Sequence, residues 1–167
     1  EIVWAKPNCM PFSGKDRTTP AHEMIYMLAK SPRYHYDQEA IKEPAVCAGT
    51  GPSAGKNSFK GKRQDIDERM AITDTRNKRS VWNVAVRPFK EAHFATFPPD
   101  LIRPCVLAGA PPGGEVLDPF GGAGTTGLVA LQEGRHATLV ELNPQYAEIA
   151  RARLANIQRG LPGIAAE

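Results

Sequence analysis

The chain has 167 residues, of which 41% are hydrophobic, and a formal net charge of +3. This length and composition allow one ordinary domain with a substantial core, and no apolar run is long enough to span a bilayer. The three cysteines are widely separated and form no C-x-x-C pair, and the histidines lack metal-ligand spacing. The sequence therefore predicts no disulfide framework and no metal site, and favours a reducing, cytoplasmic setting.

Two strands are predicted near the N-terminus, in the region 1–30. Residues 1–7 carry consecutive apolar side chains and stop at Pro7. Residues 23–29 are apolar on both faces, which is typical of a strand covered on both sides. We expect the two strands to form an antiparallel hairpin at a sheet edge. Because the chain opens inside such a strand and without methionine, we also expect a fragment or processed product of a longer protein.

Residues 31–80 are polar, interrupted by glycine and proline, and without a sustained period, which predicts a loop-rich insert. Between Lys42 and Arg79 there are nine Lys or Arg residues against five acids. This local excess favours contact with a phosphate backbone, although basic loops that are merely solvated are also common. The candidate DNA-binding residues are Lys56, Lys60, Lys62, Arg63, Lys78 and Arg79.

From Val81 onward the pattern alternates between strand and helix. A helix is expected over 99–108, followed by Gly109, with Pro104 kinking it or tightening its start. Asn143 is a good N-cap for the last helix. The remaining predicted elements are a strand at 115–118, a helix at 125–133, a strand at 137–140 and a helix at 143–159.

The most informative stretch is Leu117–Gly127 (LDPFGGAGTTG), where an apolar strand runs into glycines and then directly into a helix. Nineteen residues beyond Gly122, a second apolar run ends at Glu141. Glycines let backbone approach a ligand closely, a helix N-terminus offers free N–H groups, and a carboxylate accepts hydrogen bonds from ribose hydroxyls. This β-α-β pattern predicts a site for a nucleoside-containing cofactor.

The spacing Gly122-x-Gly124-x-x-Gly127 also satisfies the dinucleotide fingerprint, so an NAD-dependent oxidoreductase is an alternative. Only one β-α-β unit is visible, however, whereas the dinucleotide fold is built from two mononucleotide-binding halves. The cofactor is therefore not decided by the glycines alone.

Four motifs in one order resemble the β-group of amino DNA methyltransferases, which act on N4 of cytosine or N6 of adenine. Residues 118–126 (DPFGGAGTT), followed by 141–146 (ELNPQY), resemble the S-adenosylmethionine site of that family. Residues 2–8 and 21–31 resemble its strands beside the target-base pocket. Residues 90–98 resemble the segment that closes over the methionine end of the cofactor.

The resemblance implies an α/β fold: the Rossmann-like, doubly wound sheet of S-adenosylmethionine-dependent methyltransferases, here incomplete. The insert 31–80 would be the target-recognition region, and 81–167 the S-adenosylmethionine-binding region. Glu141 would bind both ribose hydroxyls, and Asn143 would lie near the adenosine or serve only as a helix cap. The implied base-pocket residues are Trp4, Lys6 and Asn8. The implied cofactor-binding residues are His93, Phe97, Pro98, Asp118, Phe120, Gly122, Gly124, Thr125, Glu141 and Asn143.

The family holds the exocyclic amine of the flipped base with an Asp/Ser/Asn-Pro-Pro-aromatic loop. This sequence has no such loop: residues 97–100 (FPPD) have the wrong neighbours, and 143–146 (NPQY) reads as a helix cap. In the family's order the loop precedes these motifs. We therefore expect the C-terminal half of a site-specific DNA methyltransferase, of the restriction-modification kind, that is inactive alone.

The expected partners are double-stranded DNA and either a second copy of the chain or a companion N-terminal half, with no membrane and no metal ion. A non-catalytic DNA- or cofactor-binding module remains a second alternative, because the catalytic loop is missing from the sequence.

Overall fold

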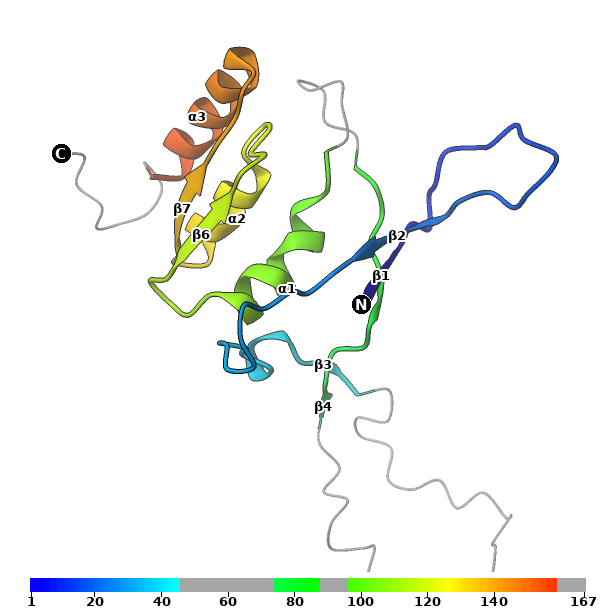
Figure 1. Cartoon of the computed structure of the whole chain (residues 1–167), viewed down its shortest axis with the longest axis horizontal. Helices are drawn as coiled ribbons and strands as arrows, with labels where there is room; N and C mark the ends of the chain where they lie inside the picture. The colour runs from blue at the N-terminus through cyan, green and yellow to red at the C-terminus, as the bar shows by residue number, and fades with distance from the viewer. Residues whose placement is uncertain (46–73, 88–95, 159–167) are drawn as a thin grey trace, which may run out of the picture.

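In a computed structural model, residues 1–45, 74–87 and 96–158 are described (Figure 1). They form a three-stranded sheet and a separate two-stranded sheet, both with helices packed against them, and a third, short pair of strands. No helix in this described part is long and apolar enough to cross a membrane.

The first sheet has the strand order β2-β1-β5. Strands β1 (Ile2–Ala5) and β2 (His22–Ile25) pair antiparallel, which confirms the predicted N-terminal hairpin, and β5 (Val81–Asn83) joins the other edge of β1 in parallel. The prediction that residues 23–29 form one strand covered on both sides is wrong. Ile25 pairs with Ile2, the first residue of β1, so residues 26–29 have no strand opposite them.

The second sheet contains β6 (Glu115–Asp118) and β7 (His136–Leu139), paired in parallel and connected through α2 (Thr125–Gln132). Helix α3 (Pro144–Gln158) follows β7 and packs on α2. This is the predicted β-α-β unit followed by its second helix. The side chains of Val116 and Ala137 pack towards the helices, whereas their strand neighbours are exposed. The described helices therefore cover one face of this sheet.

Helix α1 (Pro99–Gly109) connects the two sheets. Its residue Leu101 belongs to a buried cluster with Trp4 and Trp82 of the first sheet. Further along the helix, Val106 belongs to a second cluster with Val129 and Ala130 of α2. Pro104 lies between these residues, and the helix continues through it and includes Gly109 as its last residue.

The edges of the predicted insert are attached to this core. A 3-10 helix, η1 (Glu39–Ile41), packs on α1, and the Asp37 N–H donates to the carbonyl of Ala108 at 2.9 Å. Strands β3 (Glu43–Pro44) and β4 (Thr75–Arg76) pair antiparallel on either side of segment 46–73. The domain boundary at residue 31 stays a prediction.

The inner side of α2 should dominate the stability of the second cluster. Val129 is fully buried, so Val129→Ala should lower the free energy of unfolding by about 1–3 kcal/mol through lost burial and a residual cavity. Val140→Ala removes the same atoms from a side chain that is 55% exposed, and should change stability by less than about 0.5 kcal/mol. Urea unfolding of both variants measures the difference, and equal effects would contradict this packing.

Candidate cofactor site

The glycine loop between β6 and α2 is held against α3 and the end of β7. Gly122 and Gly124 have positive φ values of 51° and 80°. A β-carbon at Gly124 would lie 2.9 Å from Cβ of Ala150 in α3. The Gly121 N–H donates to the carbonyl of Val140 at 2.8 Å. The loop therefore needs glycine both for its backbone conformation and for its close approach to α3.

Glu141 follows β7 and reaches across to the glycine loop. Its Oε2 accepts a hydrogen bond from the Gly122 N–H at 2.7 Å, and its Oε1 accepts one from the Asn143 N–H at 2.8 Å. The carboxylate is thus fixed at the carboxyl ends of the two parallel strands, where open α/β sheets bind ligands. Asn143 Oδ1 accepts the Gln145 N–H at 2.9 Å, so Asn143 does cap α3.

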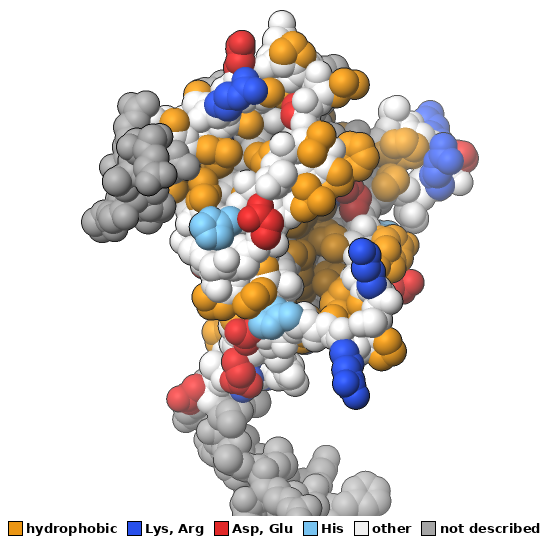
Figure 2. Space-filling view, turned by 60° about the vertical axis from the view of Figure 1, so that its left-hand side comes forward, with side chains coloured by type: hydrophobic (Ala, Val, Ile, Leu, Met, Phe, Trp, Pro, Cys, Tyr) orange, Lys and Arg blue, Asp and Glu red, His pale blue; other side chains and the backbone are white. Residues whose placement is uncertain are grey.

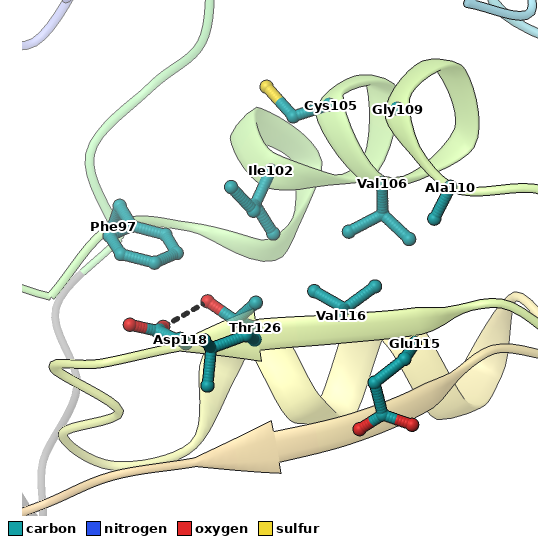
Figure 3. Close-up of a pocket in the computed structure, with 11 residues that line it drawn as sticks. Phe97, Ile102, Cys105, Val106, Gly109, Ala110, Glu115, Val116, Asp118 and Thr126 are labelled. Carbon is teal, nitrogen blue, oxygen red and sulfur yellow. Dashed lines mark hydrogen bonds between the residues drawn. The ribbon is translucent and has the colours of Figure 1, made fainter. Parts of the chain in front are cut away.

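Asp118, the last residue of β6, organises the other side of the loop. Its Oδ1 accepts the Phe120 N–H at 3.0 Å, and its Oδ2 accepts the Thr126 hydroxyl at 2.5 Å. Figure 3 shows Phe97 facing this pair across a cavity of about 410 Å³ between β6 and α1. Pro98, which precedes α1, is buried. The structure therefore brings the predicted segment 97–98 next to the end of β6.

Two large apolar side chains, one in the glycine loop and one next to Glu141 in sequence, are exposed to solvent. Phe120 is 87% exposed and Leu142 is 98% exposed. Exposed apolar side chains next to a pre-positioned carboxylate suit a ligand with an apolar ring and neighbouring hydroxyls. Leu142 was missed by the sequence analysis, and its position between Glu141 and Asn143 was the only available signal.

Arg153 was also missed. Its Nη1, on α3, donates to the carbonyl of Ala123 and lies 3.4 Å from Oγ1 of the buried Thr125. Arg153 therefore ties the underside of the glycine loop to α3. Nothing local in the sequence distinguishes it from the neighbouring Arg151.

The predicted base-pocket residues have structural partners in the first sheet and in the residues that follow β5. Trp4 is buried and its Nε1 donates to the carbonyl of Val84 at 2.7 Å. Lys6 forms an ion pair with Glu23 and lies 4.4 Å from the Trp4 ring centroid. The Asn8 amide exchanges two hydrogen bonds with the backbone of Val86, both 2.8 Å. Their role beside a target base stays a prediction.

Two of the predicted DNA-binding residues are engaged beside β4. Arg79 Nε donates to Oε1 of Glu43 at 2.7 Å, and Arg76 Nε donates to the same oxygen at 2.9 Å. Lys78 Nζ lies 5.0 Å from the ring centroid of Trp82. Outside the described residues lie Lys56, Lys60, Lys62, Arg63 and His93.

In the described part of the chain, no group of His, Cys, Asp or Glu side chains could hold a metal ion.

Comparison with known proteins gives one family and one fold. The N6/N4 methyltransferase family, described as DNA methylase, matches residues 1–152. The type II methyltransferase M.Cfr9I of Citrobacter freundii is 46% identical over 166 residues, which cover 99% of this chain and 47% of that protein. The chain thus spans about half the length of the curated relatives it matches.

Two solved structures show the same fold. The PvuII DNA methyltransferase, named as cytosine-N4-specific, has a TM-score of 0.62 at 19% identity over 91% of this chain and 49% of that chain. TTHA0409 of Thermus thermophilus, named as a putative DNA modification methylase complexed with S-adenosyl-L-methionine, has a TM-score of 0.51 at 26% identity. The match covers 98% of this chain and 54% of that chain. The predicted incomplete methyltransferase fold is confirmed.

The contact between Gly124 and Ala150 can be tested by a matched pair of variants. Gly124→Ala and Gly113→Ala both place a β-carbon on a residue with positive φ, which costs about 1–2 kcal/mol. Only Gly124 also has a close neighbour, since nothing lies within 4 Å of a β-carbon at Gly113. Gly124→Ala should therefore be less stable than Gly113→Ala by about 1–3 kcal/mol in urea unfolding. Equal losses would contradict the close packing.

The ionic cluster at Glu43 predicts a pH dependence. Desolvation raises the pKa of this carboxyl, but the hydrogen bonds and charges of Arg79 and Arg76 together have the larger and opposite effect. The pKa of Glu43 therefore lies below its ordinary value of 4.5. A carboxyl whose pKa is lower in the folded than in the unfolded state stabilises the fold at pH values above its ordinary pKa. This stabilisation is lost as the pH falls through the lowered pKa of the folded state.

The native chain should therefore exceed Glu43→Gln in stability at neutral pH, and the difference should shrink below pH 4.5. Unfolding measured against pH tests this, with Glu39→Gln, an exposed carboxylate of the same segment, as the charge control. A difference that grows on acidification would contradict the cluster.

Proposed function

Because the chain belongs to the DNA methylase family, we propose that it binds S-adenosylmethionine at the carboxyl ends of β6 and β7. It would do so as part of an enzyme that methylates an adenine N6 or a cytosine N4 in double-stranded DNA. The observation that carries the proposal is the carboxylate of Glu141, fixed 2.7 Å from the Gly122 amide at the edge of the sheet. TTHA0409, which shares the fold, is named as a complex with this cofactor.

The residues present fit the adenosine part of the cofactor. Glu141 has two oxygens, each holding one backbone amide, with acceptor capacity left for two ribose hydroxyls. Phe120 and Leu142 supply exposed apolar surface for the adenine ring. Gly122 leaves open space for the ligand, since a β-carbon there would have its nearest neighbour at 3.9 Å. Asn143 would lie near the adenosine, because its N–H is hydrogen-bonded to Glu141.

The methionine part would occupy the cavity between α1 and β6. Phe97 lines its apolar side, and Asp118 supplies a carboxylate suited to an ammonium group. Pro98, the buried residue after Phe97, stays a predicted contributor. Thr126 holds that carboxylate in place through its hydroxyl. Gly124 and Thr125 shape the loop beneath, and His93 stays a predicted contributor. S-adenosylmethionine would supply an activated methyl group on a sulfonium, and these residues would orient it.

Transfer to an exocyclic amine also requires groups that hold the base. The sequence contains no Asp/Ser/Asn-Pro-Pro-aromatic loop. We therefore infer that methylation requires a segment that carries such a loop and lies outside the 167 residues given, and that these residues alone bind cofactor without transferring methyl groups. Trp4, Lys6 and Asn8 would line the base side. A DNA substrate implies a cytoplasmic enzyme, and the type II relatives favour a restriction-modification role.

The oxidoreductase alternative is not favoured. The matching family and the type II relatives are DNA methyltransferases. The second alternative was a non-catalytic module that binds only DNA or cofactor. This is how we expect the given chain to behave in isolation, so the alternative is compatible with this proposal.

Calorimetric titration tests the cofactor site directly. Glu141→Gln should weaken S-adenosylmethionine binding about 10- to 100-fold, because hydrogen bonds to a charged group contribute about 1.5–3 kcal/mol. Glu39→Gln removes an exposed carboxylate from η1, which does not line the cavity, and should leave the affinity unchanged.

The same titration with NAD separates the alternatives, and no NAD binding is expected. Unchanged affinity in Glu141→Gln, or tighter binding of NAD than of S-adenosylmethionine, would overturn the proposal.

A further inference from the structure

The connection between β1 and β2 extends away from the sheets and helices (Figure 1). We call its residues 9–20, all of which the structure describes, the finger. Residues 10–20 are exposed without exception, and no helix or strand forms among them. Connections longer than about 12–15 residues without secondary structure are uncommon in compact domains, and many of those that occur are functional.

The base of the finger is fixed to the first sheet. The Lys6 N–H donates to the carbonyl of Ala21 at 2.8 Å and closes the connection. The side chain of Asn8, directly before the finger, forms two hydrogen bonds with the backbone of Val86, both 2.8 Å. The sheet therefore sets where the finger begins and ends.

The base of the finger also lies close to the proposed cofactor site. Lys6, three residues before the finger, lines a cavity of about 400 Å³ together with Phe97. Phe97 in turn lines the cavity proposed for the methionine part of the cofactor. One side chain thus borders both cavities, so the finger extends from the neighbourhood of the methyl group to be transferred.

Three consecutive apolar residues, Met10, Pro11 and Phe12, are exposed on the finger. Met10 is 83% exposed and Phe12 is 39% exposed. A run of three exposed apolar side chains is unfavourable in water and indicates a binding role rather than a part in the core. Met, Phe and Pro are among the side chains that DNA-binding proteins insert as wedges between base steps.

The finger carries basic residues beside this apolar run. Lys15 and Arg17 are basic, and Asp16 between them is acidic. Cζ of Arg17 lies 5.5 Å from the ring centroid of Phe12, and a β-carbon at Gly14 would collide with the same ring. The ring thus packs on Gly14 and holds Arg17 next to the apolar run.

The guanidinium of Arg17 remains available to a ligand. Its side chain is 68% exposed, and its Nε lies 3.6 Å from Oδ1 of Asp16, which is itself 72% exposed. Such an exposed ion pair contributes little and is readily exchanged for another anion. Figure 2 shows basic and apolar side chains together on the part of the molecule that projects at the right. Apolar and cationic groups side by side match the stacked bases and phosphates of DNA.

We propose that the finger contacts double-stranded DNA beside the target base, with Met10 inserted into the base stack and Arg17 bound to a backbone phosphate. This rests on the proposed function, from which the DNA substrate is taken. Enzymes that act on a base extrude it from the stack, which leaves a space beside its neighbours. Met10 suits that space because it is unbranched, adaptable and more exposed than Phe12.

A pair of labelled duplexes, one intact and one with a single abasic site, tests the insertion. The abasic duplex offers the space without the cost of extruding a base, so the native 167-residue chain should bind it more tightly than the intact duplex. Met10→Ala should weaken binding of the abasic duplex about 10-fold through lost apolar burial. Met27→Ala removes the same atoms from a side chain outside the finger that is 48% exposed, and should leave both affinities unchanged.

The salt dependence of the same binding tests the phosphate contact. Arg17→Gln should reduce the slope of log K against log salt concentration by about 0.9, equally for both duplexes. Met10→Ala should leave this slope unchanged, because an inserted apolar side chain releases no counterions. Arg151→Gln, which removes an exposed arginine from α3, should also leave it unchanged. Urea unfolding should give native stability for every variant, since all the substituted side chains lie at the surface.

Other outcomes overturn the finger. These are no DNA binding by the native chain, native affinity of Met10→Ala for the abasic duplex, or an unchanged salt slope in Arg17→Gln. Self-association that is lost in both finger variants, without an effect on DNA binding, would identify a second copy of the chain as the partner instead.

Titration of the same variants with S-adenosylmethionine separates this proposal from the proposed function. Cofactor binding together with DNA binding that ignores the finger variants refutes only the finger. Finger-dependent DNA binding by a chain that binds no S-adenosylmethionine refutes the proposed cofactor site and leaves the finger standing.

Discussion

The structure depends on one helix that belongs to two cores at once. Leu101 anchors α1 among Trp4 and Trp82, and Val106 anchors it against Val129 of α2. No strand pairing connects the two sheets among the described residues, so their mutual placement rests on this packing. Pro104 lies between the two anchors, where a fixed φ limits how far the helix can adapt.

The same helix explains why the site has two sides. The glycine loop and Glu141 belong to the β6–α2–β7–α3 unit, in which Gly124 contacts Ala150 and Arg153 holds the loop from below. Phe97 and Pro98 belong to the segment leading into α1. Phe97 faces Asp118 across the cavity only because α1 packs on α2. The adenosine side of the site is therefore local in sequence, and the methionine side is produced by tertiary packing.

This difference sets what the sequence could predict. The β-α-β unit, the loop and the cap at Asn143 follow from short-range rules about glycine, apolar runs and helix termini, and the structure has all of them. The extent of β2 was not predicted: the strand ends at Ile25, which pairs with Ile2, although residues 26–29 are also apolar. Arg153 and Leu142 were missed because their importance arises from neighbours distant in sequence or from exposure alone.

Charge counting was least informative where basic residues have acidic or aromatic neighbours in space. Arg79 shares the carboxylate of Glu43 with Arg76, and Lys78 lies on Trp82, which is itself part of the core. These contacts attach the strands on either side of segment 46–73 to the first sheet. A basic side chain held in this way can still face DNA, but its position is then set by the protein core. The sheet that would carry the base-side residues thus also orients the chain on both sides of the predicted recognition region.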